Sequence, residues 1–291
     1  MGYGLNVWIN KVDSSTCPSL TVDVTVTDPT NPGTLLNALT KDNFTVFENG
    51  VQVQGLTATP IEYPSPVSVV LAIDFSESEL DVIDTIKAAA KSFIDHLDVG
   101  DYAAIWKFNG AVESFPLPPD LFVSADATGK TDLKNYIDAQ PPAVDYTLLF
   151  SALLDSIDRA ALGTTEKRAV IVLSDGIGDH DNATLADVIA DAVQKGIPVF
   201  TIYYVDPGYV HYTSDEIANG ISNLQRLAGE TGGQYYNGLN VNLTDVFGQI
   251  ANILSNKYTL TYTSSCSGTI SLDVQVDWNN LQGKESRTIT F

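Results

Sequence analysis

The chain has 291 residues, of which 44% are hydrophobic and 18% are charged, a composition typical of a globular protein with a substantial core. Its 15 basic and 36 acidic side chains give a formal net charge of -21, which repels phosphate backbones and argues against nucleic acid as a partner. No apolar run reaches the roughly 20 residues that a membrane-spanning helix needs, and the first residues lack the features of a signal peptide. Met1 is the only methionine, so we expect the chain to be a piece of a longer, exported protein.

The first part of the chain is rich in strand signals. Residues 20–27 and 44–47 alternate between apolar and polar side chains, which is typical of half-buried strands. Asn49 and Gly50 stand between two such runs, and this dipeptide is a strong signal for a tight hairpin turn. We therefore expect residues 5–62 to form one half of a β-sandwich.

From residue 68 to about residue 254 the chain alternates between strand and helix signals. Strands are predicted at residues 68–73, 102–108, 169–173 and 199–205, and helices at residues 80–97, 147–161, 184–195, 217–228 and 241–254. Such alternation indicates a parallel sheet with helices on both faces. We predict an α/β domain over residues 66–255 with a Rossmann-like, doubly wound, mostly parallel sheet.

The last segment returns to strand signals at residues 258–262, 269–276 and 287–291. Strand-rich ends on both sides of an α/β centre suggest that residues 257–291 complete the sandwich begun by the N-terminal segment. The α/β domain would then be inserted into one of the loops of that sandwich.

Each strand-rich end carries one cysteine, Cys17 and Cys266. A disulfide needs Cα atoms about 4.4–6.8 Å apart, so pairing would require the two ends to be neighbours. Two unpaired buried thiols are the alternative. We predict the disulfide, and it favours an extracellular, cell-surface or periplasmic location, because disulfides persist in oxidising compartments.

Oxygen-bearing side chains gather where the predicted parallel strands end. Asp74, Ser76 and Ser78 follow the first of these strands at alternate positions, Thr147 precedes a helix, and Asp175 follows a later strand. Open α/β sheets bind ligands at the carboxyl edge of their strands, so three loops would bring five oxygen ligands together. Carboxylates, hydroxyls and retained water suit Mg²⁺, with Mn²⁺ or Ca²⁺ also possible, and leave a coordination position for an outside ligand.

The order of these five residues and their strand context resemble the metal-ion-dependent adhesion site of von Willebrand factor type A domains. The resemblance covers the predicted α/β domain. It implies that Ser76, Ser78 and Thr147 bind the ion directly, whereas Asp74 and Asp175 act mostly through bound water. It also implies a protein ligand whose Asp or Glu carboxylate fills the open coordination position.

The predicted sandwich extends this resemblance. Bacterial cell-surface proteins of the family, and integrin β subunits, are similar in flanking the metal domain with a sandwich built from both ends, and residues 39–50 resemble the bacterial version. Integrin β subunits have a second metal site that uses paired acids soon after the first motif. Here Val82 stands beside Asp81, so we predict no such second site.

Simpler interpretations exist for several of these residues. Asp and Ser after a strand often only cap the next helix, but capping does not explain the recurrence of such residues in three loops. Residues 179–181, Asp-His-Asp, could form a calcium-like acidic loop, although a solvated turn is the more ordinary interpretation. The three histidines, His96, His180 and His211, lack partners at zinc spacing.

Three functional classes follow from these patterns. We favour a surface or secreted adhesion module that binds a protein through Mg²⁺ and a ligand carboxylate. An intracellular assembly factor that works with an ATPase is the second class, because the family includes such subunits. A metal-assisted hydrolase with Asp74 as nucleophile is the third. The sequence argues against an enzyme, since it has no Gly-x-Ser-x-Gly turn, no Gly-rich phosphate loop before a Lys, and no evident general base beside the motif.

Overall fold

The computed structural model describes residues 5–27, 36, 39–60, 66–141, 146–165, 167–178, 181–205, 211–239, 241–255 and 258–291. The chain divides into two compact units. The central unit is Pro66–Ala251, and the end unit combines Met1–Ser65 with Asn252–Phe291.

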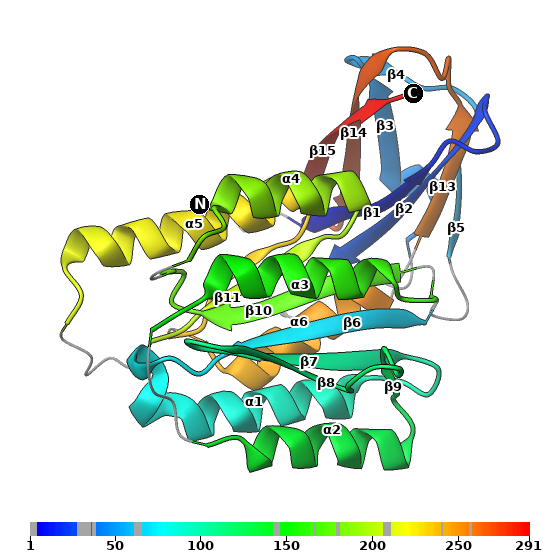
Figure 1. The fold of residues 1–291 in the computed structure, drawn as a ribbon. Coiled ribbons are helices and arrows are strands. Elements are labelled where there is room, and N and C mark those ends of the chain that lie inside the picture. The colour runs from blue at the N-terminus through cyan, green and yellow to red at the C-terminus, as the bar shows by residue number, and fades with distance from the viewer. Residues whose placement is uncertain are drawn as a thin grey trace. The chain divides into compact units, whose positions relative to one another are not determined.

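A mostly parallel sheet forms the middle of the central unit (Figure 1). Its strands are β6 (Val67–Asp74), β7 (Tyr102–Phe108), β8 (Val112–Phe115), β9 (Val123–Ser124), β10 (Lys167–Ser174), β11 (Val199–Tyr203) and β12 (Tyr235–Asn237). The spatial order is β12-β11-β10-β6-β7-β8, and β9 also pairs with β7. The pairs from β12 to β7 are parallel, whereas β8 and β9 run antiparallel to β7. Every residue of β6 is buried, as expected for a strand covered on both faces.

Helices cover both faces of this sheet (Figure 1). They are the 3-10 helix η2 (Glu77–Val82), α1 (Ile83–His96), α2 (Ala127–Ala139), α3 (Leu149–Ala161), α4 (Leu185–Lys195), α5 (Ser214–Thr231) and α6 (Leu243–Ser255). Leu153 of α3, Val188 of α4 and Leu224 of α5 join one apolar cluster with Val70 of β6. On the other face, α1 and α6 meet through the rings of Phe93 and Phe247, whose centroids are 5.4 Å apart.

Local differences from the predicted elements have physical causes. The helix predicted from residue 80 begins earlier, as the 3-10 helix η2. The helix predicted from Thr147 begins at Leu149, so Thr147 lies in the loop before α3. The helix α2 was not predicted, since its polar sequence has only a weak apolar stripe, and its start is set by Asp126, whose carboxylate accepts hydrogen bonds from Thr128 N and Gly129 N.

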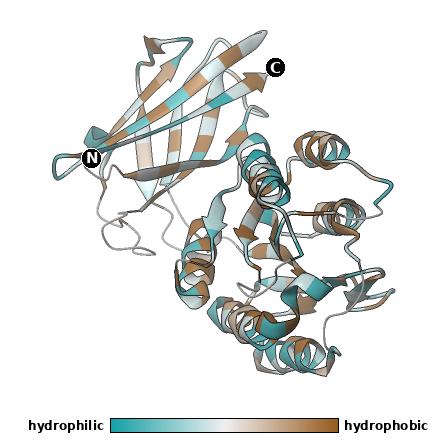
Figure 2. Ribbon diagram, turned by 90° about the vertical axis from the view of Figure 1, so that its left-hand side faces the viewer, coloured by the Kyte–Doolittle hydropathy of each residue, from teal (hydrophilic) through white to brown (hydrophobic). Residues whose placement is uncertain are grey.

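Two antiparallel sheets build the end unit. The strands of the first sheet lie in the order β1 (Asn6–Asp13), β2 (Ser19–Thr27), β13 (Tyr258–Thr263), β5 (Thr57–Pro60). Those of the second sheet lie in the order β15 (Leu281–Thr290), β14 (Thr269–Trp278), β3 (Phe44–Glu48), β4 (Val51–Gln52). The 3-10 helix η1 (Lys41–Asn43) precedes β3. Both sheets thus contain strands from both ends of the chain. Apolar residues of the two sheets form one core, and Figure 2 shows the alternation of hydrophobic and hydrophilic residues along the long strands.

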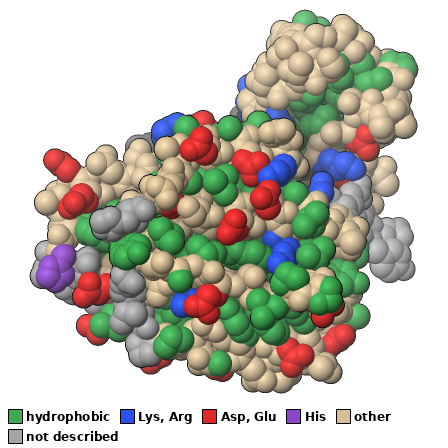
Figure 3. Space-filling model, in the orientation of Figure 1, with side chains coloured by type: hydrophobic (Ala, Val, Ile, Leu, Met, Phe, Trp, Pro, Cys, Tyr) green, Lys and Arg blue, Asp and Glu red, His purple; other side chains and the backbone are tan. Residues whose placement is uncertain are grey.

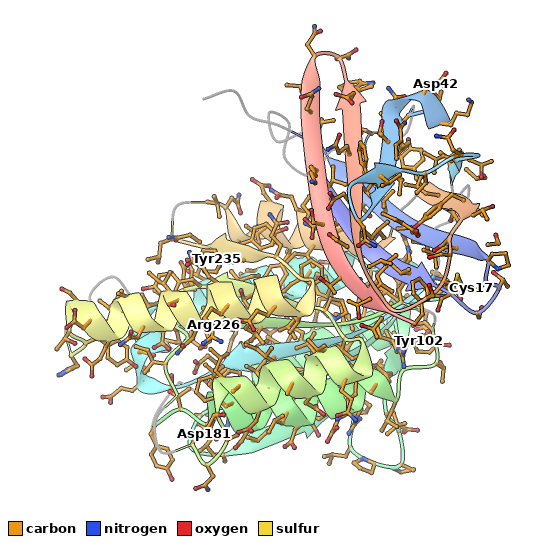
Figure 4. The ribbon with its side chains drawn as sticks, turned by 90° about the horizontal axis from the view of Figure 1, so that it is seen from above. Cys17, Asp42, Tyr102, Asp181, Arg226 and Tyr235 are labelled. Atoms are coloured by element: carbon orange, nitrogen blue, oxygen red, sulfur yellow. A yellow bond between two sulfur atoms is a disulfide. The ribbon has the colours of Figure 1, made fainter. Side chains whose placement is uncertain are left out.

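The disulfide between Cys17 and Cys266 is present, with the two Cα atoms 6.1 Å apart, as predicted (Figure 4). The predicted fold class is also confirmed, with a mostly parallel central sheet and flanking antiparallel sheets. In the part of the chain that the structure describes, no helix is both long enough and apolar enough to cross a membrane. Acidic side chains are dispersed among apolar and neutral ones on the face in Figure 3, as on a solvated surface.

Candidate metal site

Asp74 is the last residue of β6 and lies at the centre of the carboxyl edge of the sheet. Its side chain is completely buried. One carboxylate oxygen, Oδ1, accepts a hydrogen bond from Ser76 N at 2.9 Å, and the other, Oδ2, accepts one from Ser174 Oγ at 2.7 Å. Ser174 is the last residue of the neighbouring strand β10. The Asp74 carboxylate is therefore held by its own loop and by the next strand, and both donors are neutral.

Ser76 and Ser78 place two more oxygens beside Asp74. The backbone of Ser76 is extended, and η2 begins at the next residue. Both serines are buried, and their Oγ atoms are 3.1 Å apart. Each hydroxyl keeps lone pairs that can face a cation, so the two oxygens are close enough to share one small ion.

Asp175 follows β10 and supplies the second carboxylate. It is buried, and its Oδ1 accepts a hydrogen bond from Ile177 N at 2.8 Å. The helix α5 lies directly against this loop, because Asn223 Nδ2 donates to Gly176 O at 3.1 Å. A Cβ on Gly220 of α5 would lie 2.4 Å from Asp175 O, so only glycine allows this approach.

The two carboxylates interact electrostatically. The pKa of Asp74 is raised from 3.8 to about 7, chiefly by burial and then by the negative charge of Asp175, although the hydrogen bonds from Ser76 and Ser174 act to lower it. Two acids in a buried site cannot easily both be ionised without a nearby positive charge. The pair is therefore poised either to hold a proton or to face a cation.

Thr147 reaches the same edge from a separate loop, and its side chain is buried. The next residue, Leu148, donates from its backbone N to Asn109 O at 2.9 Å, and Asn109 follows the end of β7. Since β6 lies between β7 and β10, this bond holds the loop beside the strand that ends in Asp74. Asp145, which precedes Thr147 in the predicted loop, lies outside the described residues.

Asp181 has a role that the sequence did not predict. Its carboxylate accepts hydrogen bonds from the backbone N of Phe150 at 2.6 Å and of Ser151 at 3.0 Å, so it caps α3. The sequence pattern concealed this role because the partners are distant in the chain. Its neighbours in the acidic run, Asp179 and His180, lie outside the described residues, so the calcium-like loop is not tested.

Sequence reasoning also missed Glu79 and Ser174, two buried residues at this edge of the sheet. Glu79 is completely buried and immediately follows Ser78. Burial is the main cause that raises the pKa of Tyr203 and of Tyr204, and the charge of Glu79 adds to both shifts, which puts this acid near the end of β11. The available signal for Glu79 was its place directly after Ser78 and before the predicted helix, and the signal for Ser174 was its place directly before Asp175.

The donor set fits a small, hard cation. No group of three or more His, Cys, Asp or Glu side chains in the described part of the chain could hold a metal, so a site built from acids alone is absent there. The candidate set instead combines two carboxylates with neutral hydroxyls. Oxygen ligands of this kind, few in number and only partly charged, match Mg²⁺, which keeps several of its waters.

Comparisons with known proteins bear on the fold. No family model matches the chain, and no curated protein does. Among solved structures, a von Willebrand factor type A protein from Catenulispora acidiphila is 11% identical to this chain, with a TM-score of 0.52. The match covers 98% of this chain and 72% of the Catenulispora chain. The chain has the von Willebrand factor type A fold.

Two further structures with this fold come from pilus proteins. The type A domain of the type V pili tip protein Mfa5 from Porphyromonas gingivalis is 16% identical, with a TM-score of 0.51, and the match covers 67% of this chain and 97% of that one. The pilus adhesin SpaC from Lactobacillus rhamnosus GG, in its open conformation, is 12% identical, with a TM-score of 0.52, and covers 91% of this chain but 36% of its own. These three structures are at most 16% identical to this chain, so they show likeness of fold.

Proposed function

We propose that this chain is an adhesion or protein-binding module of the type A fold that holds a divalent cation, Mg²⁺ or alternatively Mn²⁺ or Ca²⁺, at Asp74, Ser76, Ser78, Thr147 and Asp175. The observation that carries the proposal is the buried network at the end of β6. There the Asp74 carboxylate receives only neutral hydrogen bonds while the charge of Asp175 bears on it.

The protein's own residues prepare this site before any ion binds. Ser76 N and Ser174 Oγ fix the orientation of the Asp74 carboxylate, and Ile177 N fixes that of Asp175. A bound cation would supply positive charge and an open coordination position. Because the protein offers only two carboxylates, that charge is incompletely neutralised, and a ligand carboxylate in a partly dry site gains a strong electrostatic contact.

A protein ligand that presents an Asp or Glu carboxylate is therefore the proposed partner. Two of the similar structures are a pilus adhesin and a pilus tip protein, which supports adhesion as the purpose of such binding. The disulfide between Cys17 and Cys266 supports an exported protein, in an extracellular, cell-surface or periplasmic location. It also speaks against the intracellular assembly factor.

The hydrolase alternative is poorly supported by the surroundings of Asp74. A nucleophilic carboxylate needs an oxygen that can reach a substrate. Asp74 is completely buried, and each of its oxygens already accepts a hydrogen bond. We therefore propose binding without catalysis.

A peptide array tests the proposal. Peptides that contain Asp or Glu, and matched peptides with Asn or Gln, are probed with the wild-type chain in Mg²⁺ and in EDTA. We expect some acidic peptides to bind the wild-type chain in Mg²⁺. This binding should be lost when the acid is replaced by its amide, when EDTA is added, or when the chain carries Asp74→Ala.

Asp187→Ala is the matched control, because Asp187 caps α4 and its side-chain hydrogen bonds within the described residues go to Thr184, which is not a site residue. This variant should bind as the wild type does. Binding that survives both EDTA and Asp74→Ala would refute the proposed function.

A further inference from the structure

Asp181 contacts two of the loops that build the candidate metal site. Its Oδ2 accepts hydrogen bonds from Phe150 N at 2.6 Å and Ser151 N at 3.0 Å. Its Oδ1 accepts hydrogen bonds from Ser151 Oγ at 2.5 Å and Ala183 N at 3.2 Å. Figure 4 labels Asp181 near the start of α3. Each oxygen of Asp181 thus accepts two hydrogen bonds from protein donors, whereas each oxygen of Asp74 accepts one, so the Asp181 carboxylate is a structural link rather than an ion ligand.

The link joins two loops that carry candidate ligands. Asp181 belongs to the segment between β10 and α4, which also contains Asp175. Its partners Phe150 and Ser151 belong to the first turn of α3, directly after Thr147. The Asp181 carboxylate therefore ties the loop of one ligand to the helix that follows the other.

The start of α3 is held on its other side as well. Leu148 N donates to Asn109 O, next to the end of β7, while Asp181 holds the same helix start from the β10 side. Because β6 lies between β10 and β7, the helix start is attached on both sides of the strand that ends in Asp74. The position of Thr147 relative to Asp74 and Asp175 depends on these two attachments.

We propose that Asp181 is a positioning residue for the divalent cation, which sets the separation between Thr147 and Asp175; this inference rests on the proposed function. Without the Asp181 carboxylate, the start of α3 loses these backbone hydrogen bonds to the β10 side and keeps the one to the β7 side. The cation must then order the loop that carries Thr147, and this ordering reduces its affinity. Partners that orient metal ligands typically change affinity by about 10- to 100-fold when they are removed.

The experiment compares Mn²⁺ affinity and thermal stability in two variants that each lose a helix cap. Asp181→Ala removes the cap of α3. Asp126→Ala is the matched control, since Asp126 accepts from two backbone N–H groups at the start of α2, a helix that supplies no candidate ligand. Titration calorimetry with MnCl₂ gives the dissociation constant, and the metal-free melting temperature gives the structural cost of each substitution.

We expect Asp181→Ala to weaken Mn²⁺ binding by about 10- to 100-fold, and Asp126→Ala to leave it unchanged although its melting temperature also falls. If the Asp181→Ala variant does not fold, the Asp181→Asn variant takes its place in the Mn²⁺ titration. It retains one oxygen acceptor for the backbone of α3 but loses acceptors on its other side, so its affinity should lie between those of the wild type and Asp181→Ala.

Several results would overturn the inference. Equal Mn²⁺ affinity in the wild type, Asp181→Ala and Asp181→Asn would reject the positioning role while leaving the proposed function in place. An equal loss in Asp126→Ala would show that helix capping acts only through general stability, and this also rejects the role. A wild-type chain that binds no Mn²⁺ would reject both the inference and the metal site on which it rests.

Discussion

At the proposed metal site, the single buried carboxyl of Asp74 would couple proton binding to metal binding. In the folded, metal-free protein its pKa is raised from 3.8 to about 7, chiefly by burial. Between these two values the folded state holds a proton that the unfolded state has lost. The resulting stabilisation is fully present below the lower pKa and disappears as the pH rises through the higher one.

We therefore predict that Mn²⁺ and this proton compete for the site. The affinity for Mn²⁺ should rise as the pH increases from 5 to 8, and binding at pH 6 should release about one proton, because ligands must be deprotonated to bind a metal. Calorimetry at pH 6 and pH 8.5 in buffers with different ionisation enthalpies measures the number released. Release of the same number at both pH values would contradict a role for the Asp74 proton.

Single residues differ in how far the sequence reveals them. The ligand roles of Asp74, Ser76 and Ser78 could be predicted because these residues follow one another closely after an apolar run that is readily recognised as a strand. These roles stay predictions. The hydroxyl of Ser174 bonds to a residue 100 positions away, which no local pattern encodes.

At the scale of elements, α5 packs so closely on the Asp175 loop that the contact leaves no room for an added side chain. Gly220 of α5 approaches Asp175 O so closely that an added methyl group must displace one of the two segments. Gly176, in the same loop, has a φ of +82°, so the loop cannot easily adjust its backbone if another residue replaces it.

We predict that Gly220→Ala lowers the melting temperature of the central unit and weakens Mn²⁺ binding, since the Asp175 loop must move. Gly229→Ala in the same helix is the control, because a Cβ there meets no atom within 4 Å. The control should keep Mn²⁺ affinity and gain up to about 1 kcal/mol of stability, as alanine favours helix. Calorimetric unfolding and Mn²⁺ titration of both variants make the comparison, and wild-type behaviour of Gly220→Ala would contradict it.

Elements with strong periodicity could be predicted, and weakly patterned ones could not. The strands β6 and β10 are continuous apolar runs, and the helix α3 has a clear apolar face, so their existence followed from the sequence. The helix α2, the short strands β8, β9 and β12, and the first half of β15 were missed. The strand β15 lies at the edge of its sheet, and its successive residues Lys284 and Glu285 are both charged. Charged residues therefore occur on both faces of the strand, and the sequence lacks the alternation of apolar and polar residues that is typical of a half-buried strand.

At the scale of the whole molecule, the chain forms two cores: it begins in the end unit, builds the central unit and then returns to the end unit. Strands from both ends pair within each sheet of the end unit, and the disulfide joins those ends across 249 positions. The sequence could predict the split because strand signals stop and resume on either side of the α/β region. The pairing of β13 between β2 and β5 could not be predicted, since several orders of short strands satisfy the same apolar pattern.

We predict that loss of the disulfide destabilises the end unit and spares the metal site. Replacement of Cys17 and Cys266 by serine removes a covalent restraint from the unfolded chain, which the loop-entropy model values at about 5 kcal/mol for a long loop and less when part of that loop stays folded. Calorimetry should show a lower transition for the end unit, with the Mn²⁺ dissociation constant unchanged. An equal shift of every transition would instead show that the two units unfold as one.

The central claim is that loops distant in sequence converge on one divalent ion. Crystals grown with MnCl₂ and measured at a wavelength where manganese scatters anomalously test it most directly. The account predicts one strong anomalous peak bounded by Ser76, Ser78 and Thr147, with Asp74 and Asp175 within reach of the waters around the ion. A map without that peak, or with Thr147 and Asp175 turned away from Asp74, would contradict the account.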